Sequence, residues 1–187
     1  MQAALSSLNR RGKVEEKNLH WWKDLTHPQT FQHYRSVEKW DRYYLNIARE
    51  IAKMSKCASR QIGALITVDN RIVATGYNGS PPDVDLCQTK DYECPRKELG
   101  LPSGQNLDLC PAVHAEVNAI VTAARVGISV NGGTMYAYCT VPCVGCTGAI
   151  ISAGIRRVVC LDEPIYHALS LPMFKMAGVE VVQYDKD

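Results

Sequence analysis

Between residues 61 and 184 the chain alternates short apolar runs with segments of helical period. The runs QIGALITV and RIVATGYN are joined by Asp69–Asn70 and predict a β-hairpin with a two-residue turn. Helix and strand then alternate three times, with helices near 114–126, 143–154 and 164–178 and strands near 133–141, 156–161 and 179–184. This order predicts an α/β fold with three layers (α/β/α), in which helices cover both faces of a mixed central sheet of about five strands.

The segments before the hairpin suggest how the chain is divided. Residues 1–37 are polar without a sustained period and predict an N-terminal arm, whereas an amphipathic helix is predicted from Trp40 to Met54. Residues 38–187 are expected to form the domain, and Pro172 is expected to kink or end the last helix.

Size and charge exclude several classes of protein. The chain has 187 residues, enough for one domain, and 21 Lys plus Arg against 19 Asp plus Glu leave a net charge of +2. This balance argues against a nucleic-acid partner. The sequence has neither an apolar run near the ~20 residues that a membrane span needs nor an apolar leader. We therefore expect a cytoplasmic protein without membrane contact, whose eight cysteines are thiols or metal ligands.

Two short motifs predict a zinc site that does chemistry. His114 and Glu116 open one predicted helix, and Pro142, Cys143 and Cys146 open another. A Cys₂His set leaves the fourth position of a tetrahedral zinc ion for water, which is typical of catalytic sites. Glu116 is then the candidate catalytic proton carrier beside the metal. The alternative is a closed structural zinc knuckle with Cys110 or another thiol as the fourth ligand.

These motifs resemble those of the zinc-dependent cytidine/deoxycytidylate deaminase superfamily. SKCASRQIGALI, RIVATGYNGSP, HAEVNAI, TMYAYCTVPCVGC and AGIRRVV are similar, in this order, to deoxycytidylate (dCMP) deaminases of bacterial and phage type. The resemblance implies a cytidine-deaminase-like fold and a hydrolase that converts dCMP and water to dUMP and ammonia, which supplies thymidylate synthesis. It also implies a homohexamer or other homo-oligomer, activation by dCTP, inhibition by dTTP, and Mg²⁺ accompanying the regulatory nucleotide.

The same resemblance marks further residues for substrate and metal. Asn78, Ser59 and Arg60 are candidates for substrate binding. For Asn78 the alternative is a tight turn of positive φ, and for Arg60 a solvated or interface arginine. Cys57 and Cys87 match ligands of a second, structural zinc in some relatives, and Cys94 and Cys110 in the long loop would complete a Cys₄ site. The alternative is four reduced or buried cysteines, or one disulfide among them.

Two other functions remain open from sequence alone. One is a deaminase of a different base, acting on dCTP, cytidine or tRNA adenosine. The other is an inactive zinc-binding assembly module, against which the intact Glu116 argues.

Overall fold

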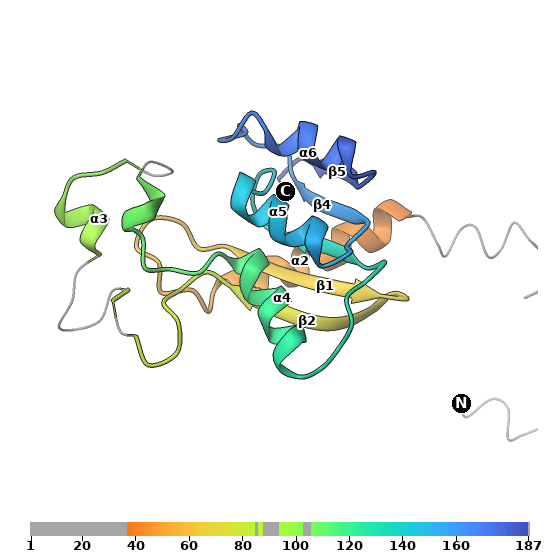
Figure 1. Ribbon diagram of the computed structural model, residues 1–187, viewed down its shortest axis with the longest axis horizontal. Coiled ribbons are helices and arrows are strands. Elements are labelled where there is room, and N and C mark those ends of the chain that lie inside the picture. Colours follow the sequence, from red (N-terminus) through yellow and green to blue (C-terminus); the bar gives the residue numbers. More distant parts are fainter. Residues whose placement is uncertain (1–36, 85, 88–93, 103–105, 187) are drawn as a thin grey trace, which may run out of the picture. The chain divides into compact units, whose positions relative to one another are not determined.

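Figure 1 shows the computed structural model, which describes residues 37–84, 86–87, 94–102 and 106–186. The chain divides into two compact units, residues 1–40 and 41–187. Apart from Val37, the expected arm lies outside the described residues, so the boundary at residue 37 stays a prediction. The sheet and the candidate site both belong to the second unit.

Five strands form one mixed sheet in the order β2-β1-β3-β4-β5. β1 pairs antiparallel with β2 and with β3, whereas β3, β4 and β5 run parallel. The predicted mixed sheet of five strands is confirmed. The strands are Gly63–Val68 (β1), Arg71–Tyr77 (β2), Thr134–Ala137 (β3), Arg157–Leu161 (β4) and Glu180–Tyr184 (β5).

Helices cover both faces of this sheet, which confirms the three layers. From Asp41 onward α2 packs on one face, and α4, α5 and α6 pack on the other. Within β1, for example, Ala64 and Ile66 face α4 and α5 while Leu65 faces α2, because successive side chains of a strand point to opposite faces. The helices are Val37–Ala52 (α2), Pro95–Glu98 (α3), Ala115–Arg125 (α4), Val144–Ser152 (α5) and Ser170–Met176 (α6), with a 3-10 turn at Leu107–Leu109 (η4).

The predicted hairpin turn is confirmed at Asp69 and Asn70. Their φ angles are 50° and 58°, the left-handed values that both central residues of a type I′ turn require. Asp and Asn tolerate this conformation because their short polar side chains bond locally to the backbone. The turn therefore joins β1 and β2 as the sequence indicates.

Close packing of α4 on the sheet depends on Gly76 in β2. A β-carbon at Gly76 would collide with the main chain of Ala115 and Ala119 in α4. The missing side chain lets the first turns of α4 lie directly against β2. This contact fixes the end of α4 that carries the candidate site.

Two elements differ from the expectation. The last helix begins at Ser170, so Pro172 lies in its first turn, where a missing N–H breaks no helical hydrogen bond. The prediction that Pro172 kinks or ends the helix is therefore wrong. The strand expected to run to Val141 ends at Ala137, because the N–H of Cys139 turns back to the carbonyl of Ala137 at 2.8 Å.

Among the helices of the described residues, none is both long and apolar enough to cross a membrane.

Candidate active site

His114 stands at the N-terminal end of α4 and is held there from two sides. It is the residue that precedes the first helical turn, with an extended backbone. Its neighbour Val113 forms a two-way backbone bridge with Gly79, with N···O distances of 2.8 and 3.2 Å. One turn further, Asn118 donates a hydrogen bond of 2.8 Å to the carbonyl of Tyr77. The loop after β2 and the start of α4 thus fix the imidazole.

Cys143 and Cys146 open α5 in the same way. Cys143 immediately precedes the helix, and Cys146 lies in its first turn, where the free N–H groups of the helix favour negative charge on sulfur. The preceding segment is anchored to β4, because Leu161 N–H donates to the carbonyl of Cys139 at 2.8 Å. The parallel pairing of β3 and β4 therefore determines where these two thiols lie.

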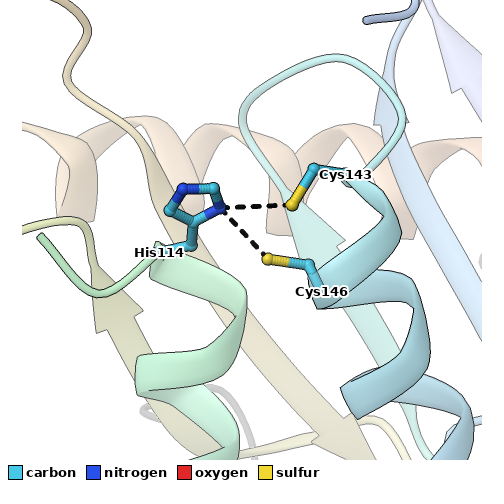
Figure 2. Close-up of side chains that lie close together, drawn as sticks. All are labelled: His114, Cys143 and Cys146. Carbon is cyan, nitrogen blue, oxygen red and sulfur yellow. Dashed lines mark hydrogen bonds between the residues drawn. The ribbon is translucent and has the colours of Figure 1, made fainter. Parts of the chain in front are cut away.

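Figure 2 shows that the imidazole of His114 points at both thiols. His114 Nδ1 lies 3.3 Å from Cys146 Sγ and 3.4 Å from Cys143 Sγ. The three possible ligand atoms all lie within 4.8 Å of one another, and no other such group occurs among the described residues. Zinc–nitrogen and zinc–sulfur bonds of about 2.1 and 2.3 Å at a tetrahedral angle separate N and S by about 3.6 Å. In spacing and ligand chemistry the group fits a zinc ion.

Of the three groups, Cys143 is the one whose pKa is shifted toward the metal-binding form. A hydrogen bond from Cys146 lowers the pKa of Cys143 to about 3, and the same bond raises the pKa of Cys146. The hydrogen bond with Cys143 raises the pKa of His114. Cys143 is therefore a thiolate at neutral pH, already in the form that binds metal.

Glu116 lies beside this group in the first turn of α4. Its side chain is only 3% exposed, yet it lines the pocket into which His114 and Cys143 also project. Burial raises the pKa of its carboxyl group above the usual value. A raised pKa makes a carboxyl group a better proton acceptor, which suits a general acid–base role.

The pocket is a concave site that opens to solvent, the usual form of a small-molecule site. Eight of the candidate site residues line it. Cys146 belongs to the metal group but does not line the pocket, and neither do Cys87 and Cys94. The eight are Cys57, Ser59, Arg60, Asn78, Cys110, His114, Glu116 and Cys143.

Asn78 is buried, and its side chain forms hydrogen bonds to the backbone of residues 60–62, which follow α2. Its side-chain oxygen accepts the N–H of Ile62 at 2.8 Å, and its side-chain amide donates to the carbonyl of Arg60 at 2.8 Å. Asn78 and Gly79 do not have positive φ, so the tight-turn alternative for this position is wrong. Asn78 thus fixes the backbone that presents Ser59 and Arg60, while contact with a nucleotide stays a prediction.

Arg60 is held at the pocket by partners more than 100 positions away. It donates to Glu163 at 2.5 Å and to the hydroxyl of Tyr166, and its guanidinium lies over the Tyr166 ring, 5.5 Å from the centroid. Glu163 is held in turn by Thr140, whose hydroxyl donates to its carbonyl at 2.8 Å. The description of Arg60 as a freely solvated arginine does not fit this arrangement.

The four cysteines assigned to a second zinc are free, partly buried thiols. Within the described residues they do not form a group of three with ligand atoms within 4.8 Å. Cys57 and Cys110 nevertheless line the same pocket. The Cys₄ site stays a prediction.

Sequence reasoning missed Arg96, Tyr166 and His167, which also line the pocket. Tyr166 and His167 fall in a segment interpreted as helix, but α6 begins only at Ser170. No local pattern marks them, because tertiary packing alone brings the loop after β4 to the start of α4.

Comparison with known proteins gives the family. The family model of the cytidine and deoxycytidylate deaminase zinc-binding region matches residues 38–162. A deoxycytidylate deaminase of Schizosaccharomyces pombe is 34% identical over 167 residues, 89% of this chain and 50% of that protein. One from Mycobacterium phage D29 is 38% identical over 129 residues, 66% of this chain and 95% of that protein.

This chain spans about half the length of two yeast relatives, 50% of the Schizosaccharomyces pombe protein and 45% of a deoxycytidylate deaminase of Saccharomyces cerevisiae. Among solved structures, dCMP deaminase from the cyanophage S-TIM5 in complex with dCMP and dUMP has the same fold. Its TM-score is 0.62 at 24% identity, over 78% of this chain and 97% of the other. By the extent of the family match and the identity to these relatives, the chain belongs to the cytidine and deoxycytidylate deaminase family.

Proposed function

We propose that this protein is a zinc-dependent dCMP deaminase, which hydrolyses dCMP to dUMP and ammonia and so supplies dUMP for thymidylate synthesis. The observation that carries the proposal is the placement of Glu116, a buried carboxyl group in the pocket that His114 and Cys143 line. The names of the relatives support the substrate, since both the yeast and the mycobacteriophage proteins are deoxycytidylate deaminases.

His114, Cys143 and Cys146 would hold the zinc ion, which would supply a water molecule activated for attack on C4 of cytosine. Glu116 would accept a proton from the attacking water and deliver it to N3 of the base. It would then carry the proton of the hydroxyl group added at C4 to the departing amine, so that water and dCMP become dUMP and ammonia. The burial of Glu116 supports this role, because it raises the pKa of the carboxyl group and so favours uptake of a proton.

Ser59 and Arg60 are proposed as substrate-binding residues at the mouth of the pocket. Both line it, and Arg60 is oriented by Glu163 and Tyr166. Asn78 supports them by holding their backbone, whether or not it also touches the nucleotide.

A second zinc ion is proposed for Cys57, Cys87, Cys94 and Cys110. The partly buried, unpaired state of all four thiols supports it, as does the need of the long loop between β2 and α4 for an anchor. Zinc analysis of the purified protein tests this proposal: two ions per chain are expected, falling to one in the double variant Cys57→Ser, Cys94→Ser. One ion per chain, unchanged in that variant, contradicts it.

The family resemblance also leads us to propose that dCTP activates the enzyme, that dTTP inhibits it, and that Mg²⁺ accompanies the regulatory nucleotide. On the same ground we propose assembly into a homohexamer or other homo-oligomer. Sedimentation with and without dCTP or dTTP tests the assembly, and initial rates under the same conditions test the regulation.

The central experiment compares the zinc-loaded protein with Glu116→Gln on dCMP, dCTP, cytidine and an RNA substrate. We expect turnover of dCMP, and loss of nearly all of it in Glu116→Gln without loss of zinc. Turnover restricted to RNA or to dCTP contradicts the substrate assignment. Unchanged deamination by Glu116→Gln contradicts the mechanism.

A further inference from the structure

An ion pair holds the pocket arginine Arg60 from outside the pocket. Arg60 lines the pocket, whereas its partner Glu163 is not among the described residues that line it. Nη2 of Arg60 donates to Oε2 of Glu163 at 2.5 Å, and the two side chains are 31% and 21% exposed. The orientation of a group at the pocket wall therefore depends on a residue set back from that wall.

Glu163 is itself fixed by its surroundings. Its N–H donates to the carbonyl of Leu161 at the end of β4, at 3.0 Å. Its own carbonyl accepts the hydroxyl of the buried Thr140 at 2.8 Å. The second carboxylate oxygen, Oε1, lies 3.5 Å from the ammonium of Lys186. These contacts hold both the backbone of Glu163 and its carboxylate, so the acceptor offered to Arg60 has a defined place.

The guanidinium of Arg60 keeps donors for a ligand. A guanidinium carries five N–H donors, and two of them are taken by Glu163 and by the hydroxyl of Tyr166. The backbone of Arg60 is fixed as well, because its carbonyl accepts the side-chain amide of Asn78 at 2.8 Å. Within the described part of the chain, three donors therefore remain for an anionic group in the pocket.

Two effects of Glu163 on an anionic ligand oppose each other. A free arginine loses side-chain freedom when it binds a ligand, and the bond to Glu163 removes that freedom beforehand. The negative charge of Glu163 repels an anion, but both side chains are partly exposed, so water and salt screen this repulsion. We therefore expect the gain in orientation to exceed the repulsion.

We propose that Glu163 is a positioning residue, which increases the affinity for the anionic substrate by holding Arg60 in the orientation that binds it. This inference rests on the proposed function, because it takes dCMP as the substrate and Arg60 as a substrate contact. Glu163 neither lines the pocket nor belongs to the metal group. Its effect is therefore on substrate binding and not on the chemical step.

The test compares Glu163→Gln with Glu163→Ala in the full-length, zinc-loaded protein, with kcat and KM measured for dCMP. Both variants remove the negative charge, but only glutamine keeps an oxygen that can accept the hydrogen bond from Arg60. We expect KM in Glu163→Ala to be about 3- to 10-fold higher than in Glu163→Gln, because the freed arginine must be ordered on binding. In both variants kcat should change less than about twofold, as for the loss of a contact that serves binding alone.

A double-mutant cycle with Arg60→Gln shows whether Glu163 acts through Arg60. In that background the KM values of the Ala and Gln variants at position 163 should differ less than about twofold, because no guanidinium remains to be held. Glu180→Ala is the matched control. It removes the exposed carboxylate of another arginine pair, Arg157–Glu180, and should leave KM unchanged.

Equal KM values in Glu163→Gln and Glu163→Ala overturn the inference while the proposed function stands, and so does a difference that persists in the Arg60→Gln background. Thermal melting and zinc analysis show whether each variant is folded. If Glu163→Ala does not fold, Glu163→Ser takes its place, since its short side chain also fails to reach Arg60. A wild-type protein that turns over no dCMP overturns the proposed function, and this inference with it.

Discussion

The carboxylate of Asp41 on α2 is held by the guanidinium of Arg157 on β4 through two hydrogen bonds of 2.7 and 2.8 Å. Asp41 is 1% exposed and also accepts the hydroxyls of Tyr136 at 3.1 Å and Tyr184 at 2.9 Å. One carboxylate on the helix thus joins three strands of the sheet. It fixes α2 on the face of the sheet opposite to α4.

Replacing Asp41 by Asn should lower the free energy of unfolding by about 2–4 kcal/mol, since Arg157 keeps its charge but loses its buried partner. Urea denaturation measures the change. The exposed pair of Glu50 and Lys53 is the control, and Glu50→Gln should have little effect because both side chains are 65% exposed. Equal effects of the two substitutions would show that the buried pair does not hold α2.

Gly76→Ala should destabilise the protein by about 2 kcal/mol or more and reduce its zinc content. The added β-carbon pushes against the main chain of Ala115 and Ala119, and so displaces the start of α4 that carries His114. Gly148→Ala in α5 is the matched control: nothing lies within 4 Å of its new β-carbon, and alanine favours a helix by about 1 kcal/mol. Thermal melting and zinc analysis of both variants check this. A Gly76→Ala protein with full zinc would contradict the close packing described for α4.

Cys146→Ser should remove one zinc ion per chain and lower the midpoint of thermal unfolding. The thiolate is a ligand that a hydroxyl does not replace, and bound metal stabilises the folded state. Cys160→Ala is the control, since Cys160 is buried in β4 outside the metal group and should leave the zinc content unchanged. Zinc retained in full by Cys146→Ser would mean that this thiol is not a ligand.

Alkaline pH should destabilise the protein through Cys160. Burial raises the pKa of this thiol to about 12, against about 8.5 in an unfolded chain. Between these values the unfolded state binds fewer protons, so the free energy of unfolding falls as pH rises, by at most about 1.4 kcal/mol per pH unit. Urea denaturation with reductant at pH 7.5, 9 and 10 measures the slope. The Cys160→Ala variant should be less stable at every pH, but its free energy of unfolding should depend less on pH. An unchanged slope in this variant would assign the pH dependence to other groups.

Asn78→Ala should lower the free energy of unfolding by about 2 kcal/mol and raise KM for dCMP. The substitution leaves the N–H of Ile62 and the carbonyl of Arg60 without their side-chain partner. Asn46→Ala, at an exposed position of α2, should change stability by less than about 0.5 kcal/mol. If Asn78 acted only as a nucleotide contact, KM would rise with no loss of stability.

Much of the fold can be predicted because its signals are local. The alternation of apolar runs and helical segments predicts the order of strands and helices, and Asp69–Asn70 predicts the hairpin turn, since both residues accept positive φ. The failure at Pro172 is informative: proline excludes a helix interior but not a first turn, and the sequence does not say where the helix begins.

The candidate metal group was also accessible from sequence. His114 and Cys143 each precede a helix, and a histidine with two cysteines at such spacing is the ligand set that zinc prefers. The residue types and their spacing therefore predict this metal group without any knowledge of its geometry.

Tertiary structure alone decided which residues surround this group. Arg60 meets Glu163 across 103 positions, and Arg157 meets Asp41 across 116, because sheet order brings distant segments together. Arg96 carries no local signal, yet it lines the pocket. The sequence determined the candidate metal ligands and the helices that carry them, because side-chain chemistry and hydrophobic periodicity are local properties. The pocket wall depended on long-range packing, which no local pattern encodes.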